Sequence, residues 1–164
     1  MVNSKTRKKT VMTQTETQTF PEQATSTVRI LVADDHEVMR LGMRNLLEGQ
    51  SNWAVCAEAS NGIEAVERTA ECQPDVVILD ITMPTMNGLE AARRISASYP
   101  EIPIILFSLH LSDERVPKLT VATIRGAVCK GEAGRDLVEA VETVLNGGTF
   151  FGGKKSIPRA TQNL

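Results

Sequence analysis

The chain has 164 residues, with 18 Lys and Arg, 20 Asp and Glu and 41% hydrophobic residues, which fits one globular domain and argues against a fibrous repeat or wholesale disorder. No apolar run approaches the ~18–20 residues that cross a bilayer, and the early basic residues lead into threonines and not into an apolar signal core, so we expect a cytoplasmic protein without a membrane segment. Residues 28–151 hold 11 basic and 18 acidic side chains, which argues against the Lys/Arg-rich face of a nucleic-acid-binding domain.

The pattern of apolar residues divides the chain into three parts. Residues 1–27 carry eight threonines and no apolar periodicity, which is typical of a disordered arm. Residues 28–151 alternate strand and helix patterns and form the predicted domain, and the polar residues 152–164 predict a flexible tail. The predicted strands are 28–33, 53–57, 75–80, 102–107 and 124–129. The predicted helices are 38–47, 61–70, 88–99, 112–120 and 137–145, of which the fourth is the least regular because Pro117 falls in its second turn.

Strand-then-helix units in succession require a parallel sheet with helices on both of its faces. The unbroken apolar strands 30–33, 76–79 and 102–107 agree, since strands buried on both faces do not alternate apolar with polar residues. The sequence therefore predicts an α/β fold built on a doubly wound, five-stranded parallel sheet. In such sheets ligands bind at the carboxyl ends of the strands.

Polar residues stand where four of the predicted strands end. They are Asp34, Asp35, Asp80, Ser108 and Lys130. The topology gathers three carboxylates, a hydroxyl and an ammonium at one edge of the sheet, and such carboxylates repel one another unless a cation intervenes. An all-oxygen acidic site of this kind suits Mg²⁺, which shares its coordination shell with water and phosphate.

These residues resemble the receiver domains of bacterial two-component response regulators, most closely those of the NarL/FixJ type. The resemblance rests on Asp34-Asp35, on residues 80–88, on Ser108 and on Lys130, and it covers residues 28–151. It implies the flavodoxin-like (βα)5 receiver fold. It also implies a phosphoacceptor that assists its own phosphorylation and dephosphorylation, and not an enzyme with turnover.

The resemblance also implies a role for each site residue. Asp80 would accept the phosphoryl group from a phosphohistidine, while Lys130 and Ser108 would contact the phosphoryl oxygens. Mg²⁺ would be held by Asp35, Asp80 and the backbone carbonyl of Thr82, with Asp34 acting largely through water. In-line phosphoryl transfer needs positioning and charge neutralisation more than covalent chemistry, and these residue types provide both.

Receivers of this type normally precede a helix-turn-helix output domain, and too few residues follow Phe151 to form one. We therefore expect a single-domain regulator that is phosphorylated by a histidine kinase or phosphotransfer protein and signals through a protein partner; a homodimer is left open.

Three alternatives are a receiver fragment of a DNA-binding regulator, a Mg²⁺-dependent aspartyl phosphatase of the haloacid dehalogenase group, and a structural dimerisation module. The phosphatase alternative rests on Thr82, because enzymes of that group carry an Asp or Thr two residues after the nucleophilic aspartate, here Asp80.

Two positions depart from the family pattern. Ala127 stands where receivers usually carry an aromatic switch residue, and Pro117 interrupts the fourth predicted helix. Both departures lie where receivers respond to phosphorylation by a change of conformation. They therefore concern that conformational response and not the ability of Asp80 to accept phosphate.

The histidines and cysteines carry no separate site in this interpretation. His36 and His110 are interpreted as loop residues beside the site. Cys56, Cys72 and Cys129 lack paired spacing, and we expect them to be buried, reduced thiols.

Overall fold

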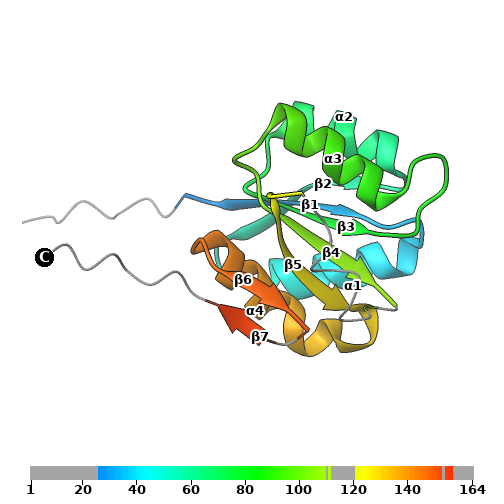
Figure 1. Cartoon of the computed structure of the whole chain (residues 1–164). Coiled ribbons are helices and arrows are strands. Elements are labelled where there is room, and N and C mark those ends of the chain that lie inside the picture. The colour runs from blue at the N-terminus through cyan, green and yellow to red at the C-terminus, as the bar shows by residue number, and fades with distance from the viewer. Residues whose placement is uncertain (1–25, 110, 112–120, 153, 157–164) are drawn as a thin grey trace, which may run out of the picture.

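The computed structural model describes residues 26–109, 111, 121–152 and 154–156, the last of these without their side chains (Figure 1). Most of the predicted N-terminal arm, the predicted helix 112–120 with Pro117, and His110 lie outside the described residues. No helix within the described ranges is long and apolar enough to cross a membrane.

Strands and helices alternate along the described chain as predicted. The strands are β1 (Val28–Ala33), β2 (Trp53–Ala59), β3 (Val76–Asp80), β4 (Ile104–Ser108), β5 (Ile124–Cys129), β6 (Thr149–Phe151) and β7 (Lys154–Ser156). The helices are α1 (Glu37–Glu48), α2 (Gly62–Cys72), α3 (Gly88–Ser98) and α4 (Ala133–Leu145), with a short 3₁₀ turn, η1 (Lys130–Glu132), before α4.

The sheet order β2-β1-β3-β4-β5, with all of these pairs parallel, confirms the predicted doubly wound receiver fold. The sheet is nevertheless wider than the five strands expected from the sequence. β6 pairs in parallel with β5, and β7 returns antiparallel to β6, so the segment expected to be a flexible tail contributes a strand. The sequence signal was weak because β6 and β7 have three residues each, fewer than a periodic pattern needs.

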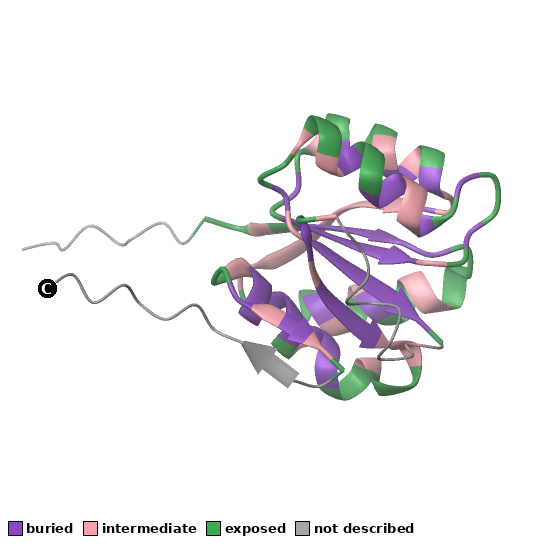
Figure 2. Ribbon diagram, viewed as in Figure 1, coloured by how far each residue is buried: buried purple, intermediate pink, exposed green. Residues whose placement is uncertain are grey.

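Helices cover both faces of the sheet, with α2 and α3 on one face and α1 and α4 on the other (Figure 1). Successive strand residues therefore enter different cores: Leu31 and Leu79 pack toward α2 and α3, whereas Ile30 and Ile78 pack toward α1 and α4. Figure 2 shows that the central strands are buried along their length while the outer sides of the helices are exposed. Burial on two faces explains the unbroken apolar runs in these strands.

The start of α2 is held by a reciprocal cap. Asn61 Oδ1 accepts a hydrogen bond from the Glu64 amide at 3.0 Å, and Glu64 Oε2 accepts from the Ser60 amide at 2.8 Å and from the Ser60 hydroxyl at 3.0 Å. The bonds from Ser60, the backbone amide first, lower the pKa of Glu64 below its usual value. The charged carboxylate therefore stabilises the end of α2 that lies nearest the loop after Asp80.

We expect Glu64→Gln to destabilise the protein at pH 7 by about 0.5–1 kcal/mol, the usual size of a lost capping contact. Because the pKa of Glu64 is lower in the folded state, its contribution is complete above the unfolded pKa and is lost as the pH falls through the folded pKa. Urea unfolding of both proteins at pH 7 and at pH 3 measures the difference. An equal difference at both pH values would contradict the cap.

Candidate functional site

The register of the parallel strands brings the predicted site residues to one edge of the sheet. Ala33 pairs with Leu79, so Asp34 and Asp80 leave neighbouring strands at the same level. Asp80 pairs with Phe107, and Ser108 pairs with Cys129, the residue before Lys130. Every predicted group at a strand end thus lies at the carboxyl edge, where doubly wound sheets bind ligands.

Lys130 joins two buried carboxylates. Its Nζ lies 2.6 Å from Asp34 Oδ2 and 2.8 Å from Asp80 Oδ2, and its side chain is only 7% exposed. The ammonium also lies 5.6 Å from the centre of the Phe107 ring, close enough for a cation–π contact. A buried ammonium with this many partners remains charged and acts as a fixed positive centre beside Asp80.

The pKa values of this pair reflect burial and charge together. Burial of Asp80 raises its pKa, and the hydrogen bonds from Lys130 and the Thr82 amide offset this only in part. Burial is the largest single effect on Lys130 and acts against its charged form, but its contacts with Asp34 and Asp80 together outweigh burial, so its pKa is raised. An ion pair alone would lower the pKa of Asp80; here burial is the largest effect, and the negative charge of Asp34 raises the pKa further.

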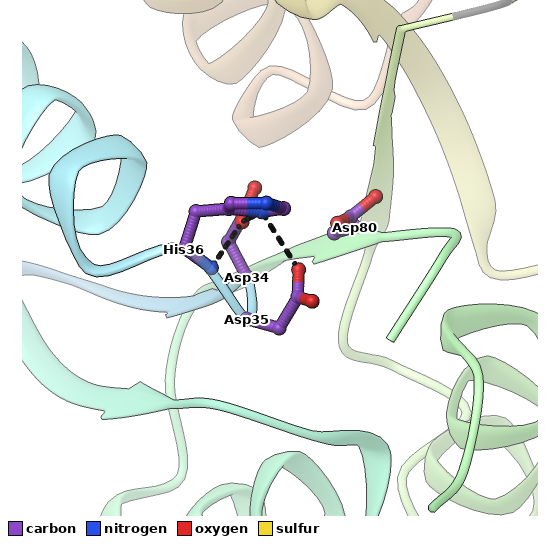
Figure 3. A group of neighbouring side chains, drawn as sticks. All are labelled: Asp34, Asp35, His36 and Asp80. Atoms are coloured by element: carbon purple, nitrogen blue, oxygen red, sulfur yellow. Dashed lines mark hydrogen bonds and ion pairs between the residues drawn. The ribbon is translucent and has the colours of Figure 1, made fainter. Parts of the chain in front are cut away.

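Asp35 and His36 form the exposed side of the site. His36 Nδ1 lies 2.9 Å from Asp35 Oδ1 and 3.2 Å from Asp34 Oδ1, and the His36 amide donates to Asp34 Oδ1 at 2.9 Å. Figure 3 shows these side chains gathered beside Asp80. The His36 side chain is 68% exposed, and we interpret it as a group that orients the two aspartates.

The acidic cluster fits a divalent cation. Ligand atoms of Asp34, Asp35, His36 and Asp80 lie within 4.8 Å of one another, and three carboxylates face one ammonium. Asp34 Oδ2 makes its ion pair with Lys130 but accepts no hydrogen bond from the described residues. The oxygen donors and the excess of negative charge suit Mg²⁺ better than a softer metal.

The other two predicted residues lie at the same edge. The Thr82 amide donates to Asp80 Oδ1 at 3.1 Å, which fixes the first turn of the loop after β3. Ser108 ends β4 and is buried, and it is engaged in further interactions within the chain. Gly88 lies where this loop enters α3, and its amide donates to the Ile81 carbonyl at 3.0 Å.

Sequence reasoning missed two groups that shape the site. Arg40 on α1 donates to the Asp34 carbonyl at 2.7 Å and to Glu58 of β2 at 3.2 Å. Gly62 approaches the loop after Asp80, and its amide donates to the Met86 carbonyl at 2.9 Å. The position of Arg40 one turn into α1, facing an acidic strand end, is the signal that could have indicated the first contact.

We expect Mg²⁺ to raise the melting temperature. At a free concentration ten times its Kd, a ligand that binds only the folded state adds ~1.4 kcal/mol, which shifts the melting temperature of a domain of this size by several degrees. Scanning calorimetry with MgCl₂ and with KCl at matched ionic strength measures this shift. Asp35→Asn should remove most of it, whereas Asp75→Asn, at the opposite edge of the sheet, should retain it. If Mg²⁺ shifts the melting temperature of both variants equally, the ion does not bind at Asp35.

Comparison with known proteins agrees with this geometry. Residues 30–142 match the family described as "Response regulator receiver domain". The chain is 36% identical over 124 residues to the oxygen regulatory protein NreC of Staphylococcus epidermidis, covering 75% of this chain and 57% of that protein. It is 31% identical over 137 residues to the transcriptional regulatory protein DegU of Brevibacillus brevis, covering 84% of this chain and 56% of that one.

Among solved structures, a LuxR-family two-component response regulator from Aurantimonas is similar, with a TM-score of 0.72 and 36% identity. The match covers 76% of this chain and 89% of that one. The chain thus spans little more than half the length of the curated relatives named above.

Proposed function

The chain belongs to the response regulator receiver family, and from this we propose that it accepts a phosphoryl group on the Asp80 carboxylate from a phosphohistidine donor. The observation that carries the proposal is the cluster in which Lys130 contacts both Asp34 and Asp80 at the carboxyl edge of the sheet. A carboxylate oxygen of Asp80 attacks phosphorus, and the bond from phosphorus to the donor imidazole breaks. The imidazole nitrogen keeps the electron pair and takes up a proton.

The neighbouring groups prepare this step. Lys130 offsets negative charge on the incoming phosphoryl oxygens, and Ser108 donates a hydrogen bond to one of them. Asp34, Asp35, Asp80 and the Thr82 carbonyl would hold Mg²⁺, which when bound neutralises charge on the phosphoryl group. Positioning and charge neutralisation of this kind account for most of the catalysis of phosphoryl transfer.

The first test is chemical. With Mg²⁺ and acetyl phosphate, the protein should gain one phosphoryl group that is stable to acid and labile to base, detected as a shift in intact mass. Chelation of the Mg²⁺ should prevent the gain. Uptake on serine or histidine, or release of phosphate from a small ester with repeated turnover, would contradict the proposal and would support the phosphatase alternative.

The partners follow from the same chemistry. We propose a histidine kinase or phosphotransfer protein as donor and a protein as the downstream target. Residues 28–151 hold 11 basic and 18 acidic side chains, which supports a protein contact over direct binding of nucleic acid. Phosphotransfer from a purified, phosphorylated kinase identifies the donor.

A second proposal is that the receiver controls transcription through a further domain. DegU is named a transcriptional regulatory protein, and this chain covers 56% of its length. The reading frame that encodes the chain decides between this proposal and a single-domain regulator.

We expect phosphorylation to change β5 little. In receivers, the serine at the position of Ser108 moves toward the phosphoryl group and an aromatic ring fills the space that it leaves; Ala127 is 1% exposed and its methyl group is too small to do so. Its partner on β6 is Phe151, a half-buried aromatic residue that packs on the same core. Hydrogen exchange with and without beryllofluoride should therefore show weak new protection at residues 127–129. Strong protection there that Phe151→Leu removes would show that Phe151 takes the place of the missing aromatic.

A further inference from the structure

Two of the three cysteines lie together although they are far apart in sequence. Cys56 belongs to β2 and Cys72 ends α2, 16 positions later, and their sulfur atoms are 2.9 Å apart. Both thiols are free and half-buried, so they are neither sealed in the core nor fully exposed. Cys129 lies on β5, which is separated from β2 by three strands of the sheet.

Cys56 lies at a bulge in β2, on the face of the sheet that α2 covers. Ile30 pairs with Val55 and Leu31 pairs with Ala57, so Cys56 is the extra residue between two regular pairs. A bulge changes the alternation of side chains, and here it places Ala57, which would otherwise return to the face of Val55, on the opposite face. Val55 packs toward α1 and α4, whereas Ala57 and Cys72 pack toward α2 and α3. Cys56 therefore meets the last turn of α2.

The distance between the two sulfur atoms indicates which chemistry the pair can perform. A disulfide bond is ~2.05 Å long. Two thiolates on one tetrahedral zinc ion lie ~3.8 Å apart, given Zn–S bonds of ~2.3 Å. The observed 2.9 Å lies below the zinc spacing, and the described residues supply no third metal-ligating side chain beside the pair. The geometry favours a bond between the sulfurs over a shared metal.

We propose that Cys56 and Cys72 form a reversible disulfide when the protein meets a peroxide. One of the two sulfurs, as a thiolate, attacks a peroxide oxygen, which gives a sulfenic acid and releases water after protonation. The other cysteine then attacks the sulfenic sulfur, its thiol proton leaves with the departing hydroxide as a second water, and the S–S bond forms. In sum two thiols lose two protons and two electrons, and one hydrogen peroxide becomes two waters.

The surroundings of Cys72 set how readily the pair reacts. Burial, followed by the hydrogen bond with Cys56, raises the pKa of Cys72 to about 12, although Arg29 acts in the opposite direction. Burial therefore disfavours a thiolate in this pair at neutral pH. Since a thiolate is the nucleophile, the pair should oxidise slowly at neutral pH and faster as the pH rises.

Peptide mapping tests the proposal directly. Trypsin cleaves after Arg44, Arg68 and Arg93, so it separates the two cysteines into peptides 45–68 and 69–93. After treatment with hydrogen peroxide and blocking of free thiols, these peptides should run as one linked species that dithiothreitol separates. The intact monomer should lose the mass of two hydrogen atoms.

Three variants complete the experiment. Cys129→Ser should form the link as the natural sequence does, whereas Cys56→Ser and Cys72→Ser should form none. In the Cys129→Ser protein, oxidation should raise the melting temperature by roughly 10 °C, the order expected for closing a loop of this length. Circular dichroism confirms that each serine variant is folded.

Several outcomes would overturn the proposal. They are a link that involves Cys129, a link between two chains, and stepwise oxidation of either cysteine of the pair to a sulfinic acid while the other stays free. A link that forms without any change in melting temperature would show that the bond strains the fold, and would also contradict a preformed pair.

Discussion

Asp80→Asn is expected to leave the protein folded and unable to take up a phosphoryl group from acetyl phosphate. The amide of asparagine is not a nucleophile, and the other carboxylates of the site are directed elsewhere: Asp34 toward Lys130 and Asp35 toward His36. Intact-mass measurement after incubation with Mg²⁺ and acetyl phosphate should show no labelled species. Labelling at the level of the natural sequence would contradict the assignment of Asp80 as the acceptor.

Asp75→Asn is the matched control for this variant. Asp75 lies just before β3, at the opposite edge of the sheet from Asp80, and its carboxylate accepts a hydrogen bond from the Arg29 amide at 2.7 Å. Asparagine keeps an acceptor oxygen there, so folding and labelling should both persist. Loss of labelling in this control would mean that the change acts through general stability.

Asp80→Asn should also raise the melting temperature in the absence of Mg²⁺. The pKa of Asp80 is raised by burial, so the folded state binds its proton more tightly than the unfolded state. Stability is therefore lost as the pH rises from the unfolded pKa to the folded pKa, and the ionised carboxylate costs stability at pH 7. A neutral amide removes that cost, while Lys130 keeps Asp34 as its partner.

Gly88→Ala is expected to cost at least ~1–3 kcal/mol, the usual cost of overpacking, and to lower the melting temperature by about 5–10 °C. A Cβ atom at residue 88 would lie 2.0 Å from the backbone carbonyl oxygen of Asp80, and backbone cannot rotate away as a flexible side chain can. The clash must displace either the start of α3 or the acceptor residue itself. We therefore expect slower phosphorylation of the fraction that remains folded.

Gly42→Ala makes the same chemical change as Gly88→Ala but is expected to raise the stability of the protein. Gly42 lies in the middle of α1 and is exposed, and an added Cβ meets no atom within 4 Å. Alanine in a helix interior is favoured over glycine by roughly 0.5–1 kcal/mol, so this variant should be more stable than the natural sequence. Thermal unfolding of both variants measures the contrast. Equal destabilisation would show that the helix packing near Gly42 is tighter than described.

The fold was predictable where one physical signal dominated. β1 and β5 begin and end at the predicted residues, since their apolar runs are interrupted by Asp34 and Lys130. β6 was not predicted, because its three residues Thr149–Phe151 form a strand only by pairing with Gly126 and Ala127. That pairing is a tertiary contact, and no local pattern encodes it.

The site was predictable because the carboxyl ends of parallel strands lie side by side at one edge of the sheet. Parallel strands bring Asp34, Asp80 and Lys130 together without any signal from the residues between them. The contact of Arg40 with the Asp34 carbonyl and the meeting of Cys56 with Cys72 depend instead on how α1 and α2 pack against the sheet. Features of that kind arise from packing and leave no periodic trace in a sequence.

The parallel sheet also divides the molecule into two ends with different tolerance for change. All the site residues lie at the carboxyl edge, and a strand of five residues such as β3 or β4 spans ~17 Å to the other edge. The connection from α3 to β4 turns there, with Pro100 and Glu101 exposed. Grafting a foreign peptide or a small sensor domain after Glu101 would lengthen only this turn. The amino edge is thus the natural place for building fusion proteins whose phosphoacceptor chemistry stays intact.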